Sequence, residues 1–431
     1  MMTKVIIAKS KIDCEHLLGQ FLDESHFDTL INEDTDCYLG SEDEDNIAFK
    51  FRKNYFSKQE QDAAYAGLKE AATQSQNRGL AAGPKGEKCG NREWVTEDQI
   101  RIFEYIKKEP ENAIIKSDFT EEVAAIREKY SNKESTRGLV WLSFKVKEDN
   151  FSFDRWLTEI ANLSPAERKH EANEIQETYI SDTTYANAVY SGIAGWFDRY
   201  PRIPYGRATA YTQHSYDKFK LSFPFLQTLD RGFAELLPQR HEAQRAAADK
   251  IDPSFLVPET LFTTITVNKT FRTAAHRDAG DFTNGLSNLL VLSNNGNYTG
   301  GYLILPEVRI AVNVRPGDLL LVNNHEYIHG NTPIELQDEV AERVSLVCYL
   351  REKMLDLGED AWESLRYKFV EHRRKNKEHP LQRRLWNGIS EGMWESDEWF
   401  DFVEQNGGTN LRMGRYDKKR EKKSTLEDMF G

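Results

Sequence analysis

Two histidines and an aspartate in the second half of the chain have the types and the order of a metal site. His276 and Asp278 are separated by one residue, and His329 follows much later in the sequence. Two neutral imidazoles and one carboxylate form the facial triad that binds non-haem Fe(II) and leaves adjacent coordination positions open. The sequence therefore predicts that His276, Asp278 and His329 bind Fe(II), and that a cosubstrate and O2 use the remaining positions.

Arg343 and Ser345 lie downstream of His329 in an alternating apolar segment. Residues i and i+2 of a strand share one face, so the guanidinium and the hydroxyl would point the same way. A guanidinium can hold a carboxylate through two parallel hydrogen bonds. Beside an Fe(II) site, this pair predicts 2-oxoglutarate as the cosubstrate, with Arg343 and Ser345 at its distal carboxylate.

Short apolar runs rich in β-branched residues carry these side chains and are separated by Gly, Pro and Asn. They predict strands at 262–268, 287–293, 301–306, 309–314, 318–322 and 343–350. A series of short strands is typical of an antiparallel sandwich or jelly roll. Helical patterns occupy 57–76 and 225–244 before this series and about 355–405 after it. The expected fold class is α+β, a double-stranded β-helix (jelly-roll) core at about 262–351 with helical layers before and after it.

The net charge of −13 lies mostly in the first 46 residues. The acidic run 33–45 is expected to resist packing, so that part of it forms a mobile surface segment. We therefore expect residues 1–46 to form an acidic N-terminal segment, residues 47–414 a single catalytic domain, and residues 415–431 a basic tail. Local basic stretches outside the acidic segment keep a nucleic acid open as a partner.

Composition also indicates the cellular compartment of the protein. No apolar run reaches the roughly 18 residues that a membrane helix needs, and the four cysteines are scattered. Scattered cysteines are typical of structural thiols in a reducing compartment. We expect no membrane partner and a cytoplasmic location, which would be the host-cell cytoplasm if the protein is phage-encoded.

A competing motif overlaps the second histidine. Residues 325–329 have the sequence His-Glu-Tyr-Ile-His, which matches the H-E-x-x-H signature of zinc peptidases. That chemistry needs a helix, so that both histidines share one face. An apolar strand pattern precedes the motif, and Gly330 and Pro333 follow it. A zinc peptidase is therefore a remote alternative, and His325 is not expected to be a ligand.

Two further segments carry cations next to turn-forming or aromatic residues. Aromatic side chains alternate with arginines in 195–211, which would suit either a wall that stacks bases and neutralises phosphates or an ordinary packed loop. Arg78 lies in a Gly-rich turn, where it could contact a phosphate or the cosubstrate, although a plain loop is the commoner explanation.

Together these segments resemble the TET/JBP family of Fe(II)- and 2-oxoglutarate-dependent DNA base hydroxylases, most of all the base-J thymine hydroxylases and their phage relatives. The segment Asn268-Lys-Thr-Phe-Arg-Thr before the His-x-Asp pair is the most specific match. The resemblance implies a double-stranded β-helix and oxidation of the 5-methyl group of a pyrimidine, thymine or 5-methylcytosine, in DNA. It also implies the iron and 2-oxoglutarate residues named above, with Arg207 as a further cosubstrate contact. Candidate substrate-binding residues are Asn268, Arg272, Asp281 and Arg78.

Alternatives remain open at this stage. A hydroxylase of free nucleotides or of protein side chains would share every iron and cosubstrate residue. A cupin-like binding module would keep the fold but would have no need of Arg343 and Ser345. A stacked base cannot enter a jelly-roll mouth, so a DNA substrate implies a flipped base or a single strand.

The last residues suggest a partner of another kind. Leu426, Met429 and Phe430 follow the basic tail at spacings i, i+3 and i+4, which places them on one side of a helical turn. Such a turn could dock back on this protein or in the hydrophobic groove of another. The segment resembles the terminal sliding-clamp-binding peptides of phage replication proteins, and it predicts a sliding clamp as partner.

Overall fold

The computed structural model describes residues 3–75, 78–84, 189–199, 203–375, 394 and 396–415. The chain divides into two units. The larger comprises Met1–Gly86, Ala186–Asp198 and Gly206–Asp356, and the smaller comprises Glu87–Tyr185, Arg199–Tyr205 and Leu357–Gly431. This division differs from the single 47–414 domain expected from the sequence, because the first 46 residues belong to the larger unit.

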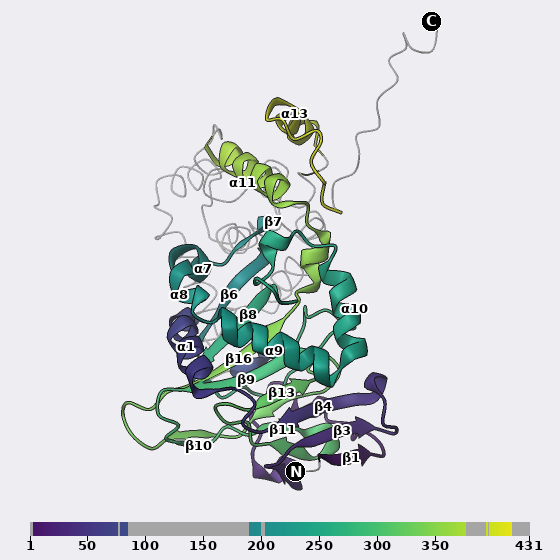
Figure 1. Ribbon diagram of the computed structural model, residues 1–431, viewed down its shortest axis with the longest axis vertical. Helices are drawn as coiled ribbons and strands as arrows, with labels where there is room; N and C mark the ends of the chain where they lie inside the picture. The colour runs from purple at the N-terminus through teal and green to yellow at the C-terminus, as the bar shows by residue number, and fades with distance from the viewer. Residues whose placement is uncertain are drawn as a thin grey trace, which may run out of the picture. The chain divides into compact units, whose positions relative to one another are not determined.

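The elements are labelled in Figure 1. The described strands are β1 (Lys4–Ala8), β2 (Thr29–Ile31), β3 (Thr35–Leu39), β4 (Ile47–Arg52), β5 (Thr73–Ser75), β6 (Val189–Arg199), β7 (Ile203–Ala208), β8 (Thr264–Lys269), β9 (Ser287–Ser293), β10 (Tyr298–Gly300), β11 (Leu303–Leu305), β12 (Ile310–Val312), β13 (Leu319–Val322), β14 (Gly330–Asn331), β15 (Ile334–Leu336) and β16 (Arg343–Tyr349). The described α-helices are α1 (Lys58–Leu68), α7 (Ala210–His214), α8 (Tyr216–Lys220), α9 (Phe223–Leu236), α10 (Pro238–Ala248), α11 (Asp360–Lys375) and α13 (Asp397–Gln405). The described 3-10 helices are η1 (Glu15–Leu17), η2 (Glu24–His26), η3 (Glu44–Asn46), η4 (Lys69–Ala71), η5 (Gly79–Ala82), η9 (Pro253–Phe255), η10 (Pro306–Val308) and η11 (Glu352–Asp356).

Mixed sheets form the framework, as the α+β expectation requires. Among the described residues, one ten-stranded sheet has the order β1-β3-β4-β13-β9-β16-β8-β6-β5, with β7 paired to β6. A four-stranded sheet has the order β14-β11-β12-β2, and β10 pairs with β15. The central strands β13, β9, β16 and β8 are antiparallel to their neighbours, whereas β1–β3 and β2–β12 are parallel pairs.

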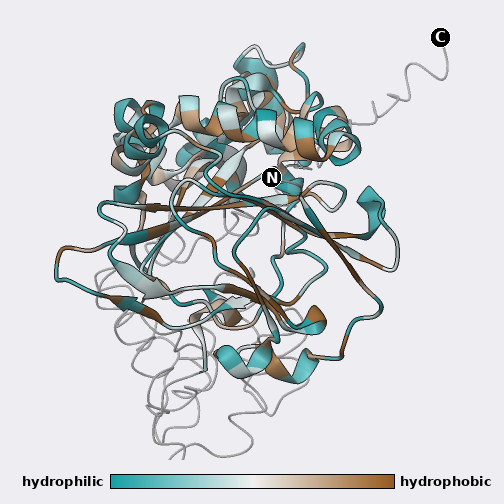
Figure 2. Cartoon of the chain, turned by 60° about the horizontal axis from the view of Figure 1, so that its bottom comes forward, coloured by the Kyte–Doolittle hydropathy of each residue, from teal (hydrophilic) through white to brown (hydrophobic). Residues whose placement is uncertain are grey.

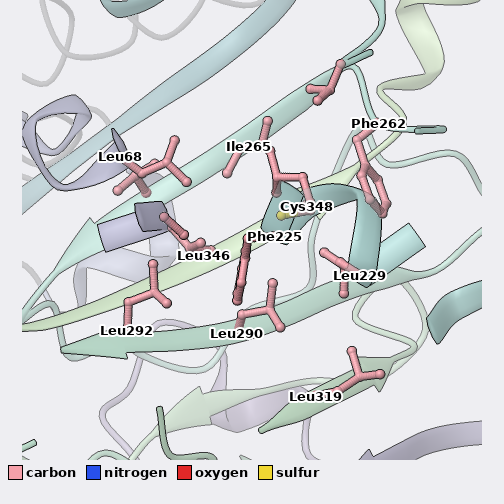
Figure 3. Close-up of a cluster of buried hydrophobic side chains, with 14 of the residues drawn as sticks. Leu68, Phe225, Leu229, Phe262, Ile265, Leu290, Leu292, Leu319, Leu346 and Cys348 are labelled. Carbon is pink, nitrogen blue, oxygen red and sulfur yellow. The ribbon is translucent and has the colours of Figure 1, made fainter. Parts of the chain in front are cut away.

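Alternation along the central strands builds a separate core on each face of the large sheet. Leu290 and Leu292 of β9 belong to a cluster with Leu68 of α1 and Phe225 of α9, and Figure 3 shows these side chains together. Leu289 and Val291 of β9 belong instead to a cluster with the small sheet, through Leu303, Leu305, Ile310 and Val312. In Figure 2 the strands are accordingly mostly brown, whereas the helices show teal and brown stretches. Burying alternate residues on opposite faces fixes the register of each strand.

Two helical expectations are corrected in extent. The capping box of Ser57 and Glu60 starts α1, but the helix ends at Leu68, and residues 73–75 form strand β5 rather than its last turn. The pattern at 225–244 belongs to two helices, α9 and α10. Leu237 has φ −139°, which is not helical, and Pro238 begins the second helix because proline is favoured in a first turn.

Part of the acidic run at the N-terminus is packed, contrary to the expectation that it resists packing: residues 35–38 are buried, whereas 40–43 and 45 are exposed. Strand β3 lies within it and pairs with both β1 and β4. The Asp36 carboxylate lies 2.6 Å from Arg52 Nη1 and 3.3 Å from Lys50 Nζ, and both cations come from the adjacent β4. These cations compensate the acidic charge, which a count along the chain does not reveal.

The segment 195–211 is also more regular than expected, because β6 and β7 occupy most of it. Trp196 packs against the helix-side core, and the Arg207 guanidinium lies 5.1 Å from the centre of the Phe197 ring. The described part of this segment is therefore mostly strand.

In the smaller unit, α11 and α13 confirm the helical pattern after residue 355. Trp362, Trp394 and Trp399 are buried together, with the Trp394 and Trp399 rings 4.9 Å apart. Within the described part of the chain, no helix is long and apolar enough to cross a membrane. The predicted clamp-binding residues Leu426, Met429 and Phe430 lie outside the described residues.

Candidate active site

The two histidines meet through their backbones. His276 and His329 form an antiparallel bridge in which the His276 N–H donates to the His329 carbonyl at 3.0 Å and the reverse bond measures 2.9 Å. The ring centres are 4.3 Å apart. Asp278 is fixed separately, since its N–H donates to the Asn324 carbonyl and its Oδ2 accepts from Asn324 Nδ2 at 3.1 Å.

The three side chains converge to the dimensions of a metal site. His276 Nε2 lies 3.4 Å from Asp278 Oδ1, and His329 Nε2 lies 3.9 Å from Asp278 Oδ2. One potential ligand atom from each residue lies within 4.8 Å of the others. The structure thus brings together the three residues that the sequence singled out as metal ligands.

Hydrogen bonds on the far side of each ring set the tautomers. His276 Nδ1 lies 2.8 Å from the Ala274 carbonyl, and His329 Nδ1 lies 3.1 Å from the Tyr327 carbonyl. A carbonyl only accepts, so each Nδ1 carries the proton and donates it. Each Nε2 is then the ring nitrogen that remains to bind a metal, as in metal-binding histidines.

The protonation states also suit a divalent cation. Burial lowers the pKa of His329 to about 4, with a further contribution from His276. Burial alone would raise the pKa of Asp278, but the hydrogen bond from His276 and the two imidazoles hold it at about 2. For His276, burial is outweighed by the hydrogen bond and charge of Asp278, so its pKa is raised. At neutral pH the Asp278 carboxylate is ionised and His329 is neutral, and a divalent cation that binds would displace the proton that Asp278 stabilises on His276.

Arg343 is a buried cation without an anionic partner. Its side chain is 1% exposed, its Nη2 donates to the Gly301 carbonyl at 3.2 Å, and its Nε has no hydrogen-bond partner. Among the described residues, no carboxylate forms an ion pair with it. Gly301 has φ +70°, and a Cβ there would lie 3.0 Å from Arg343 Nε, so glycine leaves room for the guanidinium.

One cavity connects the metal-site residues with Arg343. Its volume is about 330 Å³, at the lower end of the range for small-molecule sites. The sequence-predicted residues that line it are His276, Asp278, His329, Arg343, Ser345, Asn268, Asp281 and Arg78. The structure therefore brings eight of the predicted site residues to a single cavity.

Three of these lining residues differ in how their polar groups are satisfied. Asn268 Oδ1 accepts from Ser191, which leaves its amide nitrogen as the free donor. Asp281 accepts from Ser287, and burial together with the charge of Asp278 raises the pKa of Asp281 to about 8. Arg78 Nε is buried without a partner, and burial lowers the pKa of Arg78.

Two predicted residues do not line the cavity. Arg272 donates to the Leu22 carbonyl at 2.6 Å and lies over the Phe21 ring, so it anchors the N-terminal segment. Arg207 lies over Phe197 and is likewise absent from the lining. The peptidase alternative also fails, because residues 324–326 form a turn and the His325–His329 segment contains no helix.

Tyr349 and Arg351 line the same cavity and were missed in the sequence. They continue the alternation of β16 that begins with Arg343 and Ser345, and extending that period of two would have found them. Arg351 Nε donates to the buried carboxylate of Asp198. Burial raises the pKa of Tyr349 to about 12, so its hydroxyl stays protonated.

Comparison with known proteins relates the residues of this cavity to a protein family. Residues 199–352 match the Tet_JBP model, described as the oxygenase domain of the 2OGFeDO superfamily. The match covers 154 of the 431 residues, so the similarity to this family concerns that part of the chain. Each candidate metal ligand and both cosubstrate residues fall within the matched range, whereas Arg78 lies before it.

Curated relatives resemble part of this chain. The bifunctional helicase and thymine dioxygenase JBP2 of Trypanosoma brucei brucei is 39% identical over 164 residues, which cover 37% of this chain and 15% of the relative. The thymine dioxygenase JBP1 of the same organism is 34% identical over 191 residues, which cover 42% of this chain and 22% of the relative. This chain therefore matches less than a quarter of either relative's length.

Among solved structures, NgTET1 in complex with 5mC DNA is 21% identical to the oxygenase domain and covers 44% of this chain and 68% of that chain. The TM-score is 0.32, which is too low to support a statement about the fold.

Proposed function

We propose that this protein is an Fe(II)- and 2-oxoglutarate-dependent dioxygenase that hydroxylates the 5-methyl group of thymine in DNA. The observation that carries the proposal is a single cavity lined by two Nε2-presenting histidines, an ionised carboxylate and a buried guanidinium without an anionic partner. The family match and the names of the JBP relatives support the same activity. We interpret the two facing sheets as a double-stranded β-helix.

His276, Asp278 and His329 fit Fe(II), since two imidazoles and a carboxylate are its usual facial ligand set. Arg343 fits the distal carboxylate of 2-oxoglutarate, with the Ser345 hydroxyl on the same strand face. When bound, the iron and the keto acid together with O2 supply the oxidation of a C–H bond. The side chains of this protein bind and orient the reactants, and the buried lining limits the access of water.

Arg78 supports a dianionic cosubstrate. The cavity contains Arg78 and Arg343, neither of which has an ion pair within the described residues. Burying an unpaired guanidinium is costly, so a ligand that carries two carboxylates would relieve both groups. We assign Arg343 to the distal carboxylate of the cosubstrate. Arg78 also lines the cavity, and we assign it either to the other end of the cosubstrate or to a phosphate.

The polar groups of the cavity favour thymine over 5-methylcytosine. Beside the 5-methyl group, thymine has a carbonyl oxygen that accepts, whereas cytosine has an amino group that donates. Arg351 can only donate, and the free amide nitrogen of Asn268 also donates. Asp281 is the ionisable group that could meet the ring N–H of thymine. The base must be flipped or single-stranded to enter the cavity.

The test is turnover on oligonucleotides after anaerobic loading with Fe(II). We expect succinate and 5-hydroxymethyluracil from thymine-containing DNA and little product from 5-methylcytosine-containing DNA, measured by mass spectrometry of nucleosides. Product from thymidine nucleotides at a rate equal to that from DNA, or binding that does not weaken as salt rises, would contradict a DNA substrate. Absence of succinate from all substrates would contradict the dioxygenase.

A further inference from the structure

Glu307 is a buried carboxylate outside the cavity, and its two oxygens contact both metal-binding segments. It lies in η10 and is 5% exposed. Its Oε1 is 3.1 Å from Arg277 Nη2, and Arg277 lies between His276 and Asp278 in the sequence. Its Oε2 accepts from the Ile328 N–H at 2.6 Å, and Ile328 precedes His329. One side chain thus joins the segment of two candidate ligands to the segment of the third.

This contact matters because regular strands do not hold the ligands. His276 and His329 form an isolated bridge outside the named strands, and Asp278 follows in a loop. Groups that hydrogen-bond behind metal ligands fix their orientation, and removing them commonly costs about 10- to 100-fold in metal affinity. The Glu307 carboxylate does this through the residues adjacent to the ligands.

The N-terminal segment completes the arrangement. Arg277 Nη1 lies 2.7 Å from Glu15 Oε1, and the Ile12 N–H donates to the Glu307 carbonyl at 2.8 Å. Lys11 Nζ donates to the Glu326 carbonyl at 3.0 Å, just before the Ile328 contact. Residues 11–15 therefore contact both Glu307 and Arg277, and Arg277 also lines the cavity. Burying Glu307 is costly unless both oxygens are satisfied, and they are.

We propose that Glu307 is a positioning residue of the metal site, which sets the spacing between the His276–Asp278 segment and His329 and thereby the affinity for a divalent cation. The inference rests on the proposed function, because it takes the three side chains as metal ligands. It adds a residue that neither the sequence motif nor the cavity lining contains.

A matched carboxylate separates positioning from general stability. Asp318 is also buried, pairs with Lys53 Nζ at 2.6 Å and accepts from the Asn54 N–H at 3.0 Å. It does not line the cavity, and its partners are not adjacent to the candidate ligands. Glu307→Gln and Asp318→Asn therefore each remove one buried charge that is held by one cation and by backbone N–H groups, one for Glu307 and two, from Asn54 and Arg315, for Asp318.

The experiment measures Mn(II) binding to the full metal-free chain by titration calorimetry, with the melting temperature of each variant as a second readout. We expect both variants to melt at lower temperature than wild type. Glu307→Gln should weaken Mn(II) binding about 10- to 100-fold, whereas Asp318→Asn should change it less than about threefold. If Glu307→Gln does not fold, Arg277→Gln tests the same contact at a partly exposed position, and its Mn(II) affinity should fall in the same direction.

The outcomes are distinguishable. Equal Mn(II) affinity in wild type and in the folded Glu307 or Arg277 variant would overturn the positioning role while leaving the proposed function intact. Equal losses in Glu307→Gln and Asp318→Asn would assign Glu307 to stability alone. Wild-type protein that binds no Mn(II) or Fe(II), or that binds it equally well after His276→Ala, would instead overturn the proposed function.

Discussion

The candidate cosubstrate residues lie on one regular strand, whereas the candidate metal ligands lie on two segments outside the named strands. Arg343 and Ser345 belong to β16, which is paired on both sides with β8 and β9. The segment before His276 is held instead by distant parts of the chain, because Ala275 exchanges hydrogen bonds with Gly19 and Gln20 and the Ala274 N–H donates to the Ala81 carbonyl. Alternation alone orients the first group, and long-range contacts orient the second.

This difference implies that substitutions can impair the candidate cosubstrate site on β16 and the candidate metal site separately. A substitution on β16 should change cosubstrate affinity and leave the metal affinity intact. A substitution among the ligands or behind them should remove the metal first.

The largest effect is expected for Asp278→Ala. Its carboxylate is the one acidic ligand and lies between both imidazoles. Because loss of a residue behind a ligand already costs 10- to 100-fold in metal affinity, loss of the ligand itself should reduce succinate formation to below about 1% of wild type. Circular dichroism is the control for folding. Turnover near the wild-type rate in a folded Asp278→Ala variant would show that the metal is held elsewhere.

Arg343→Ala should separate the two halves. Truncating one member of a buried, hydrogen-bonded charge pair costs about 2–5 kcal/mol, so the half-saturating 2-oxoglutarate concentration should rise by about 100-fold or more. Mn(II) affinity in the absence of 2-oxoglutarate should stay within about threefold of wild type. Arg343→Lys retains the charge but not the planar fork of the guanidinium. Its half-saturating 2-oxoglutarate concentration should therefore lie between those of wild type and Arg343→Ala. A rise of less than threefold in Arg343→Ala would place the carboxylate anchor elsewhere.

The same division separates what could be predicted from the sequence from what could not. The α+β class, the strands at 287–293 and 318–322, and the residues on one face of β16 could be predicted, because a period of two is visible locally. The convergence of His276, Asp278 and His329 was inferred from residue types, while the bridge that creates it depends on tertiary pairing. Asn324 and Glu307 carry no local signal at all.

The departures from expectation have a common cause. The family resemblance implied Arg207 at the cosubstrate and Arg272 was a candidate substrate contact, but neither lines the cavity, and their guanidinium groups lie over Phe197 and Phe21. Part of the acidic run 33–45 was expected to stay unpacked, yet the cations of β4 compensate Asp36. Strand pairing brings together Arg207 with Phe197 and Asp36 with the β4 cations, and a tertiary contact brings Arg272 to Phe21, so the pattern of residue types does not identify these partners.

An effect of intermediate size is expected for Asp281, which lies near the candidate metal ligands, and it concerns the dependence of stability on pH. In the folded protein its pKa is raised from 3.8 to about 8 by burial and by Asp278. The folded state therefore keeps a proton that the unfolded chain has released, and stability is lost as pH rises from about 4 toward 8. The slope contributed by one such proton is at most about 1.4 kcal/mol per pH unit. Urea unfolding of metal-free protein at several pH values should show this slope in wild type and its loss in Asp281→Asn. Equal slopes in both proteins would mean that Asp281 is ionised in the folded state.

The smallest effect is expected for Glu326→Gln, which tests whether the H-E-x-x-H match has any role. In a zinc peptidase this glutamate would be the general base, and its loss would abolish activity. Here Glu326 is exposed and lies in the turn at 324–326, and the contacts that residue makes to Lys11 and Arg277 use its backbone carbonyl. Because the substitution leaves that carbonyl in place, succinate formation and Mn(II) affinity should both stay within about twofold of wild type. A zinc-dependent peptidase activity in wild type that disappears in Glu326→Gln would show that the chemistry belongs to the competing motif. Glu326→Gln also serves as the exposed counterpart of Glu307→Gln, since both replace a carboxylate near His329 by an amide. Of these two carboxylates, only the buried one of Glu307 contacts the segments that carry the candidate ligands.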